Sequence, residues 1–346
     1  MEIGSEYWKY EGNLNCNNSN FWNFGKDNKF VLSGRTAIYY VLKNICLNNN
    51  IQKVYFPSYS CTSMEQPFID LGIEIEYYDV YYNNGLKYNI NLEEECDIFF
   101  AMNYFGYSST NMDKCIKHFK QKGKIIIEDI THSILSEKKY SENSDYLIGS
   151  LRKWFPIASG GIAVNLNSKF SLDLNKNPNK EMIDIKSKAM ENKKDYINQK
   201  IDNKSEFLNQ YSESGKILEK DYKNYSIDEA SLKILMGIDI GEIIKTRIEN
   251  AKVIYEKLKN KSEIKFLINE FNEKDGLLFV PIMLKKEIRN DLRKYLIDNQ
   301  VYLPIHWPSE VNKNNVVEQE LSLICDQRYT KVQIETYINK ILEFLK

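Results

Sequence analysis

Two groups able to do acid–base or covalent chemistry follow apolar runs of the chain. Asp129 comes directly after the run 124–128, and His132 lies three residues beyond it. Lys153 follows the apolar run 146–151. A carboxylate can hold or move a proton, and an unprotonated amine is a nucleophile. Each also has an ordinary alternative, because Asp often caps a helix and a strand-end lysine often extends back to water.

A second set of residues supplies a turn and hydroxyl groups. Gly34, Arg35 and Thr36 form a turn before an apolar helical pattern. Glycine allows close backbone approach, and the free N–H groups and dipole of a helix N-terminus suit a phosphate. Ser150 precedes Lys153. The alternative for this turn is an ordinary helix start without a ligand.

The loop 57–61 is the fourth polar segment, and it follows the strand-like run 53–56. It contains Tyr59 and Cys61. By itself this loop has no chemical signature.

Taken together, these segments fit the requirements of pyridoxal 5'-phosphate. A lysine forms a Schiff base with the cofactor aldehyde, and an acid keeps a proton on the pyridine nitrogen. A helix N-terminus holds the phosphate. The sequence therefore predicts one site built from strand ends, where open α/β sheets place their ligands.

The chain resembles the DegT/StrS family of sugar aminotransferases, which have the fold of the pyridoxal-phosphate-dependent transferases of fold type I. The resemblance covers roughly residues 30–345, and its most specific part is the ordered set of EDxxH, a lysine and Gly-Gly. The matching segments are, in order, SGRTAIYYVL, VYFPSYSCTS, YYDV, AMNYFGY, IIIEDITHS, GSLRKWFPIASGGIAV and NYSIDEASLKILMGID.

The resemblance implies a role for each matching residue. Lys153 matches the lysine that binds the cofactor, and Asp129 matches the residue on the pyridine nitrogen. His132 matches a histidine beside the cofactor ring. The turn 34–36 matches the phosphate-binding turn, and Asn224 matches an asparagine that reaches the phosphate in the neighbouring subunit. The expected assembly is therefore a homodimer with shared sites.

Three positions depart from the family pattern. The position over the ring face, usually aromatic, falls on Cys61, with Tyr59 close by. The family's serine five residues before the lysine falls on Ile148, so Ser150 is expected to replace it as a phosphate ligand. The family's Asn-Tyr-Arg ends here in Ser226, which leaves the substrate open. These departures indicate a divergent subgroup.

The implied activity is transfer of an amino group from an amino acid, glutamate in our expectation, to a keto sugar. The resemblance further implies a nucleotide-linked sugar and a role in capsule or surface-polysaccharide synthesis. Tyr104, His306, Trp307 and Arg328 are the candidates for substrate contacts. Packing and a buried ion pair are the alternatives for the last three.

Other functions remain as alternatives. The lost arginine motivates an aminotransferase acting on a small phosphorylated ketone. A regulatory protein of the same fold, without catalysis, is the non-enzyme alternative. Lys153 argues against the family's dehydratase branch, which has histidine there. A dinucleotide oxidoreductase is disfavoured because no GxGxxG follows the first strand.

The elements that must position these residues alternate between strand and helix. Strand-like runs are expected at 53–56, 73–80, 97–102, 124–128, 146–151 and 161–165, with helices at 63–71 and 111–121. This alternation predicts an α/β domain with a mainly parallel mixed sheet. Surface helices are expected within 169–225 and one or two helices within 228–259. The C-terminal part predicts a small α+β domain, with strands at 277–283 and 301–304 and helices at 286–299 and 331–345.

The expected domain organisation has three parts. Residues 1–30 are polar and rich in Asn, and they are expected to form an arm. Residues 31–240 are expected to form the large cofactor-binding domain, and residues 241–346 the small domain.

Composition and charge exclude several classes of partner. With 47 basic and 48 acidic residues, the net charge of -1 disfavours nucleic acid and anionic membranes as partners. The chain has no apolar run of about 18 residues, so no membrane span is expected. Glu2 and Glu6 argue against a signal peptide. Six cysteines without a CxxC pair and three histidines predict no metal site, free thiols and a cytoplasmic location.

Overall fold

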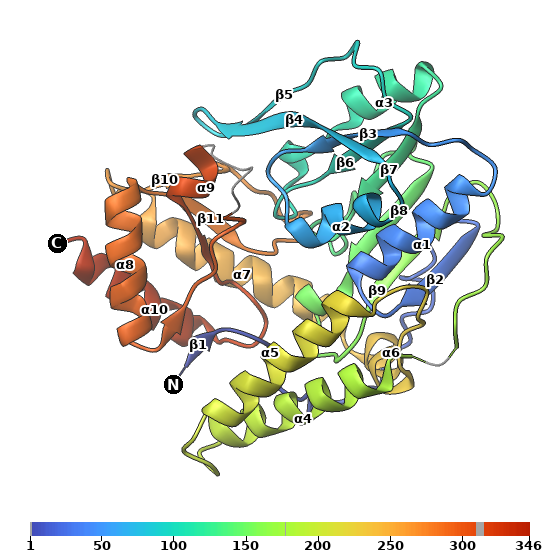
Figure 1. Cartoon of the computed structure of the whole chain (residues 1–346). Coiled ribbons are helices and arrows are strands. Elements are labelled where there is room, and N and C mark those ends of the chain that lie inside the picture. The colour runs from blue at the N-terminus through green and yellow to red at the C-terminus, as the bar shows by residue number, and fades with distance from the viewer. Residues whose placement is uncertain (1, 177, 309–314) are drawn as a thin grey trace.

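A sheet of eight strands forms the centre of the chain, of which the computed structural model describes residues 2–176, 178–308 and 315–346 (Figure 1). In spatial order the strands are β2 (Asp27–Val31), β9 (Gly161–Asn165), β8 (Tyr146–Ser150), β7 (Ile125–Asp129), β6 (Ile98–Met102), β3 (Lys53–Pro57), β4 (Glu74–Tyr82) and β5 (Leu86–Asn89). The five strands from β8 to β4 run parallel, whereas β9 runs against β8 and β2, and β5 against β4. This confirms the expected α/β fold with a mainly parallel mixed sheet.

Helices cover both faces of this sheet, and its central strand β6 is apolar throughout. All five residues of β6 are buried, as in parallel strands covered on two sides. Phe100 faces the core beneath α1, whereas Phe99 stacks on Phe119 of α3 with ring centroids 4.3 Å apart. The helices that follow the first strands are α1 (Gly34–Cys46), α2 (Thr62–Asp70) and α3 (Asp113–Gln121).

The C-terminal part forms the smaller α+β unit expected from the sequence. Its three-stranded sheet has the order β10–β11–β13, and helix α10 packs against α7 and α8. The bounds of these elements are β10 (Lys265–Phe266), β11 (Val280–Met283), β13 (Glu320–Leu323), α7 (Ile240–Leu258), α8 (Lys286–Asp298), α9 (Asn315–Gln319) and α10 (Lys331–Phe344).

The N-terminal residues connect the two parts of the molecule. Strand β1 (Ile3–Gly4) pairs in parallel with β12 (Val301–Tyr302) of the C-terminal part, and β2 forms an edge of the large sheet (Figure 1). The segment 1–30 therefore contributes strands to two sheets. The division into 1–30, 31–240 and 241–346 stays a prediction.

The Lys- and Asn-rich segment contains a pair of packed helices. Helix α4 (Lys180–Ile197) packs along α5 (Ser205–Lys220), and Figure 1 shows the pair extending away from the large sheet. Helix α6 (Glu229–Gly237) follows, capped by Asp228, which accepts a hydrogen bond from the N–H of Ser231. These bounds agree with the helices expected within 169–225 and 228–259.

Sequence patterns located the central strands but missed β1, β2, β5, β10, β13 and α9. Strand β13 alternates apolar and polar residues although all four are buried. Its Glu320 and Ser322 are buried because they bond to each other and to His306. In the part of the chain that the structure describes, no helix is both long enough and apolar enough to span a membrane.

Candidate active site

A cavity of about 270 Å³ lies where strands β7 and β8 end. Both strands present their carboxyl ends here, as open α/β sheets do at ligand sites. The sequence-predicted cofactor residues that line it are Gly34, Arg35, Cys61, Asp129, His132, Ser150 and Lys153.

Asp129 is the acid of this cavity. It ends β7, is 2% exposed, and accepts a hydrogen bond of 2.7 Å from the Thr131 N–H. Burial raises its pKa to about 6, although the bonds from Thr131 and the charge of Lys153 act in the opposite direction. No cation among the described residues forms an ion pair with it. A ligand that brings a proton or a positive charge would therefore stabilise the buried carboxylate of Asp129.

His132 is held as a neutral ring with one unused nitrogen. Its Nδ1 accepts a hydrogen bond of 2.9 Å from the Phe105 N–H, which places the ring proton on Nε2. Burial lowers the pKa of His132 well below its usual value. Nε2 is buried and has no partner among the described residues. The ring is also stacked between Phe105 and Trp307, with centroids at 5.3 and 5.7 Å.

The start of helix α1 forms the opposite part of the cavity. Ser33 caps the helix by accepting a hydrogen bond of 3.1 Å from the Thr36 N–H. A Cβ on Gly34 would lie 2.9 Å from the Ser150 Cβ, so only glycine lets this turn approach the end of β8. The first N–H groups of a helix lack intrahelical acceptors. This turn can therefore hold an anionic group.

Lys153 stands at the boundary of two cavities. It ends the short 3₁₀ turn Leu151–Lys153 directly after β8, and its side chain is exposed. It lines the cavity described above and a neighbouring cavity of about 470 Å³. The preceding β8 is fixed to the Asp129 loop, because the Ser150 N–H donates to Thr131 Oγ1 at 2.9 Å.

Three sequence-predicted cofactor residues do not line the cavity in this chain. The Thr36 hydroxyl donates to the Tyr222 carbonyl at 2.7 Å. Tyr59 is fully buried and stacks on Tyr104, with its hydroxyl unpartnered among the described residues. Asn224 has a φ of 59°, and its Oδ1 is buried without a described partner. Their cofactor roles stay predictions.

The substrate candidates lie in different surroundings. Trp307 lines the cavity next to His132. Tyr104 is buried away from the cavity and donates a hydrogen bond of 2.5 Å to the Tyr59 carbonyl. His306 lines the neighbouring cavity, and its N–H donates to Glu320 at 2.8 Å.

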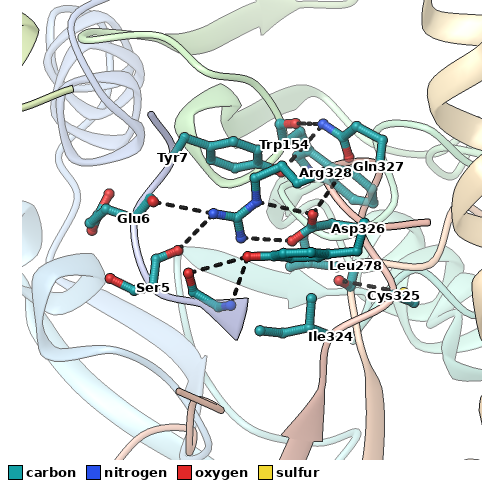
Figure 2. Close-up of polar contacts among 12 residues, drawn as sticks. Ser5, Glu6, Tyr7, Trp154, Leu278, Ile324, Cys325, Asp326, Gln327 and Arg328 are labelled. Carbon is teal, nitrogen blue, oxygen red and sulfur yellow. Dashed lines mark hydrogen bonds and ion pairs between the residues drawn. The ribbon is translucent and has the colours of Figure 1, made fainter. Parts of the chain in front are cut away.

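Arg328 is bonded within the protein (Figure 2). Its Nε and Nη2 donate to the two carboxylate oxygens of Asp326, at 3.0 and 2.7 Å. Its Nη1 donates to the carbonyls of Ser5 and Glu6, at 3.0 and 3.2 Å. The guanidinium also lies over the Tyr7 ring, 4.2 Å from the centroid. Arg328 therefore holds the N-terminal segment in place.

Sequence reasoning missed five polar residues of the cavity, one of which is Ser63 in the first turn of α2. Thr131 bonds to Asp129, and Arg152 and Lys186 add positive charge to the lining. Glu6 also lines it, with its carboxylate 3.8 Å from Lys186. Ser63, Thr131 and Arg152 had a sequence signal, because each lies inside a matching segment. Glu6 and Lys186 come together through tertiary folding alone.

These residues fit pyridoxal phosphate. Among the residues that the structure describes, the buried carboxylate of Asp129 has no paired cation, and the buried Nε2 of the neighbouring His132 has no partner. Gly34 at the N-terminus of α1 lies close to Ser150 at the end of β8, and this place suits a phosphate. Lys153 provides the amine. Among the residues that the structure describes, no group of His, Cys, Asp and Glu could hold a metal ion.

The fold is shared with solved aminotransferase structures. PseC of Helicobacter pylori, an aminotransferase involved in pseudoaminic acid biosynthesis, aligns with a TM-score of 0.67 and 12% identity, covering 100% of this chain and 99% of that one. Spr1654 of Streptococcus pneumoniae, assigned as a sugar aminotransferase and solved in its PLP form, aligns with a TM-score of 0.63 and 12% identity over 100% of both chains.

A third structure, NtdA of Bacillus subtilis with bound cofactor PMP, gives a TM-score of 0.60 at 13% identity, covering 93% of this chain and 74% of that one. No protein-family model matches the chain, and no curated protein matches its sequence. The chain therefore has the fold of the pyridoxal-phosphate-dependent transferases of fold type I, as expected. At this level of identity the similarity establishes the fold alone.

Proposed function

We propose that this protein is a pyridoxal-phosphate-dependent aminotransferase. The observation that carries the proposal is one cavity in which Lys153, Asp129 and His132 meet the N-terminus of α1. The amino donor is an amino acid, glutamate in this proposal, and the acceptor is a keto sugar. The resemblance to sugar aminotransferases supports a nucleotide-linked acceptor and a role in surface-polysaccharide synthesis in the cytoplasm.

Each residue of the cavity has a defined task in this reaction. Bound pyridoxal phosphate supplies a ring that accepts an electron pair when the Cα–H bond of the amino acid breaks. The Lys153 amine would take up that proton and pass it to the bound cofactor, and in the second half-reaction it would move a proton from the cofactor to the acceptor carbon. Asp129 would hold a proton on the ring nitrogen of the cofactor. The Nε2–H of His132 would donate a hydrogen bond to the bound cofactor. Arg35, Ser150 and the α1 N-terminus hold the phosphate.

Covalent trapping tests the proposal. The purified protein should be yellow, and borohydride should fix pyridoxal phosphate on Lys153, because its amine lies beside the residues that hold the ring and phosphate. Peptide mapping by mass spectrometry locates the label.

The control is Lys186, which lines the same cavity. Burial and the charge of Arg152 lower the pKa of Lys186 to about 8, so its amine could react with an aldehyde non-specifically. The Lys186→Gln variant should keep the label, and Lys153→Ala should lose it. A label on Lys186 or any other lysine would refute the assignment.

The alternatives differ from the main proposal in simple observations. A regulatory protein without the cofactor stays colourless when pyridoxal phosphate is added. In an aminotransferase, glutamate converts the bound cofactor to its amino form, and only the enzyme's own acceptor should convert it back. A screen of keto sugars and small keto phosphates therefore separates the proposed acceptor from a phosphorylated ketone.

A further inference from the structure

A second cavity, of about 470 Å³, lies beside Lys153. Glu6, Arg152 and Lys153 line both this cavity and the smaller one that holds Asp129. The two spaces are therefore neighbours that share a wall, and Lys153 borders both of them. A group in the larger cavity would therefore also lie beside Lys153. We call this larger space the arginine chamber.

The chain uses arginine sparingly and places it at these cavities. It has six arginines among 47 basic residues, so lysine supplies the other 41. Five of the six line one or both cavities, and Arg289 is the exception. Arginine differs from lysine in its rigid fork of N–H donors, which matches the two oxygens of a carboxylate or phosphate. The placement of the arginines thus points to recognition of an oxyanion.

Two arginines of the chamber are already bonded. Arg328 is bonded to Asp326 and to the N-terminal backbone. Arg247 donates to the carbonyls of Leu277 and Leu278 and to the Gln327 side chain, at 2.9 to 3.1 Å. These two side chains have little remaining capacity for a ligand, and their function is to hold the chamber together.

The other two arginines keep donors for a ligand. Arg152 forms no hydrogen bond or ion pair with the described residues, and its buried Nε has no partner there. Arg293 donates one long bond of 3.4 Å from Nε to the Leu303 carbonyl, and no described carboxylate pairs with it. Burial and the nearby Arg35 lower the pKa of Arg152, whereas Glu6 raises it. Bringing an anion to this site would offset the cost of burying unpaired positive charge.

We propose that the arginine chamber binds an oxyanion of the substrate, a phosphate or a carboxylate, through Arg152 and Arg293. The assignment of the ligand as substrate rests on the proposed function, because Lys153 is there the reacting amine. The anion has two sources in that reaction, the phosphate of the acceptor or the carboxylate of the donor. In either case the chamber holds the charged group while the reacting carbon lies at Lys153.

Calorimetric titration of the cofactor-loaded protein with inorganic pyrophosphate tests the chamber. Arg152→Gln and Arg293→Gln should each weaken binding about tenfold, because each removes charge-assisted hydrogen bonds. Arg152→Lys should recover only part of the loss, since lysine lacks the fork. Glu6→Gln should tighten binding by removing a negative charge near Arg152. Lys294→Gln, the exposed neighbour of Arg293 on α8, should leave binding unchanged.

A second arm identifies the source of the anion. The yellow colour of the loaded protein should fade as glutamate is added, and the half-effective concentration is measured for each variant. If it rises in both arginine variants, the chamber holds the donor carboxylate. If it stays constant while pyrophosphate binding weakens, the chamber holds the acceptor phosphate.

Two results separate failure of this inference from failure of the proposed function. If Arg152→Gln and Arg293→Gln keep the wild-type affinity for both pyrophosphate and glutamate, the proposal that the arginine chamber binds an anion is wrong. A protein that takes up no pyridoxal phosphate would overturn the proposed function. In that case the pyrophosphate titration of the same variants still decides the anion site.

Discussion

At the scale of single residues, two adjacent carboxylates have opposite surroundings. Glu128 accepts hydrogen bonds from Asn103, Ser141 and Ser144, at 2.6 to 2.8 Å. Asp129 accepts one, from Thr131. Three hydrogen bonds thus offset the burial of Glu128, whereas the burial of Asp129 is only partly offset until a ligand binds. Alternation of side chains along β7 separates the structural acid from the reactive one.

The pH dependence of stability should expose this cost. Asp129 has a pKa raised from 3.8 to about 6, so its stabilising contribution is fully present below pH 3.8 and is lost as the pH rises through 6. At pH 8 the ionised group costs about 3 kcal/mol. Asp129→Asn should therefore raise the free energy of unfolding of cofactor-free protein at pH 8 by up to that amount, as measured in urea.

The gain in the free energy of unfolding caused by Asp129→Asn should shrink as the pH is lowered toward 4. The same variant should slow the glutamate half-reaction by about a hundredfold or more, because it no longer holds the ring proton. Glu128→Gln is the matched comparison: burial raises the pKa of Glu128 as well, but its amide cannot accept all three hydrogen bonds, so this substitution should lower stability at pH 8, where Asp129→Asn raises it. Equal effects of the two substitutions would contradict the division of roles.

The Arg328–Asp326 pair leads to a prediction about stability. Both side chains are nearly buried, at 10% and 6% exposure, so breaking the pair leaves an unpaired charge. Arg328→Gln should lower the free energy of unfolding by about 3 kcal/mol and release the N-terminal segment to proteases. Denaturant titration and limited proteolysis measure the two effects. The double variant with Asp326→Asn should recover part of the loss.

A direct substrate role for Arg328 gives a different result. In that case Arg328→Gln would raise the KM while leaving stability and the proteolysis pattern as in the wild type.

At the scale of elements, the site depends on backbones that approach closely. A Cβ on Gly161, the first residue of β9, would lie 2.3 Å from the Ser33 carbonyl oxygen. Since Ser33 caps α1, the Gly-Gly motif after the lysine sets the position of the turn at the start of α1. Two motifs far apart in sequence therefore act as one structural unit.

Gly161→Ala should separate cofactor binding from general stability. The added methyl group must displace the Ser33 backbone, so we expect at least about tenfold weaker binding of pyridoxal phosphate, together with a loss of about 1–3 kcal/mol in stability. Absorbance titration with the cofactor measures the first effect and urea unfolding the second. Gly215→Ala on α5 is the control, because a Cβ there meets nothing within 4 Å.

The control should stabilise the protein by about 0.5–1 kcal/mol, as alanine replaces glycine inside a helix. It should leave the affinity for the cofactor unchanged. Normal cofactor affinity in Gly161→Ala would show that the α1 turn does not hold the phosphate.

At the scale of the whole molecule, the N-terminal segment ties distant parts together. The Tyr7 carbonyl accepts a hydrogen bond of 2.6 Å from Tyr211 of α5, and the Glu6 carbonyl accepts one of 2.5 Å from Lys193 of α4. Arg328 from the C-terminal part bonds to the same segment (Figure 2). The walls of both cavities thus depend on residues from both ends of the chain.

Assembly gives the last prediction. We propose a homodimer with two shared sites, in which Asn224 reaches the phosphate bound by its partner. The buried, unpartnered Oδ1 of Asn224 supports a role that its own chain does not fulfil. Lys153→Ala and Asn224→Ala, if both are inactive alone, should restore about a quarter of wild-type activity after mixed refolding. Half of the dimers would then carry one intact site.

The control is refolding of each variant alone, which should restore no activity. Heterodimers that form without regaining activity would show that Asn224 serves its own subunit.

The sequence by itself determined the sheet and the residues attached to it. Strands such as 98–102 are apolar at every position, and that pattern identifies a buried parallel strand without knowledge of its neighbours. Asp129, Ser150 and Lys153 could be located because each follows such a strand. Local sequence fixes where a strand ends, and the ends of parallel strands meet at one edge.

Only the tertiary structure decided which other side chains share the site. Glu6 and Lys186 are ordinary surface residues by pattern, yet they meet at the cavity because the N-terminal segment crosses α4. Thr36 and Tyr59 lie in the right motifs but face neighbouring backbone or aromatic rings. Arg328, which the sequence suggested as a substrate contact, pairs with Asp326 instead. Side-chain direction and burial depend on contacts between distant segments, and a local pattern does not contain that information.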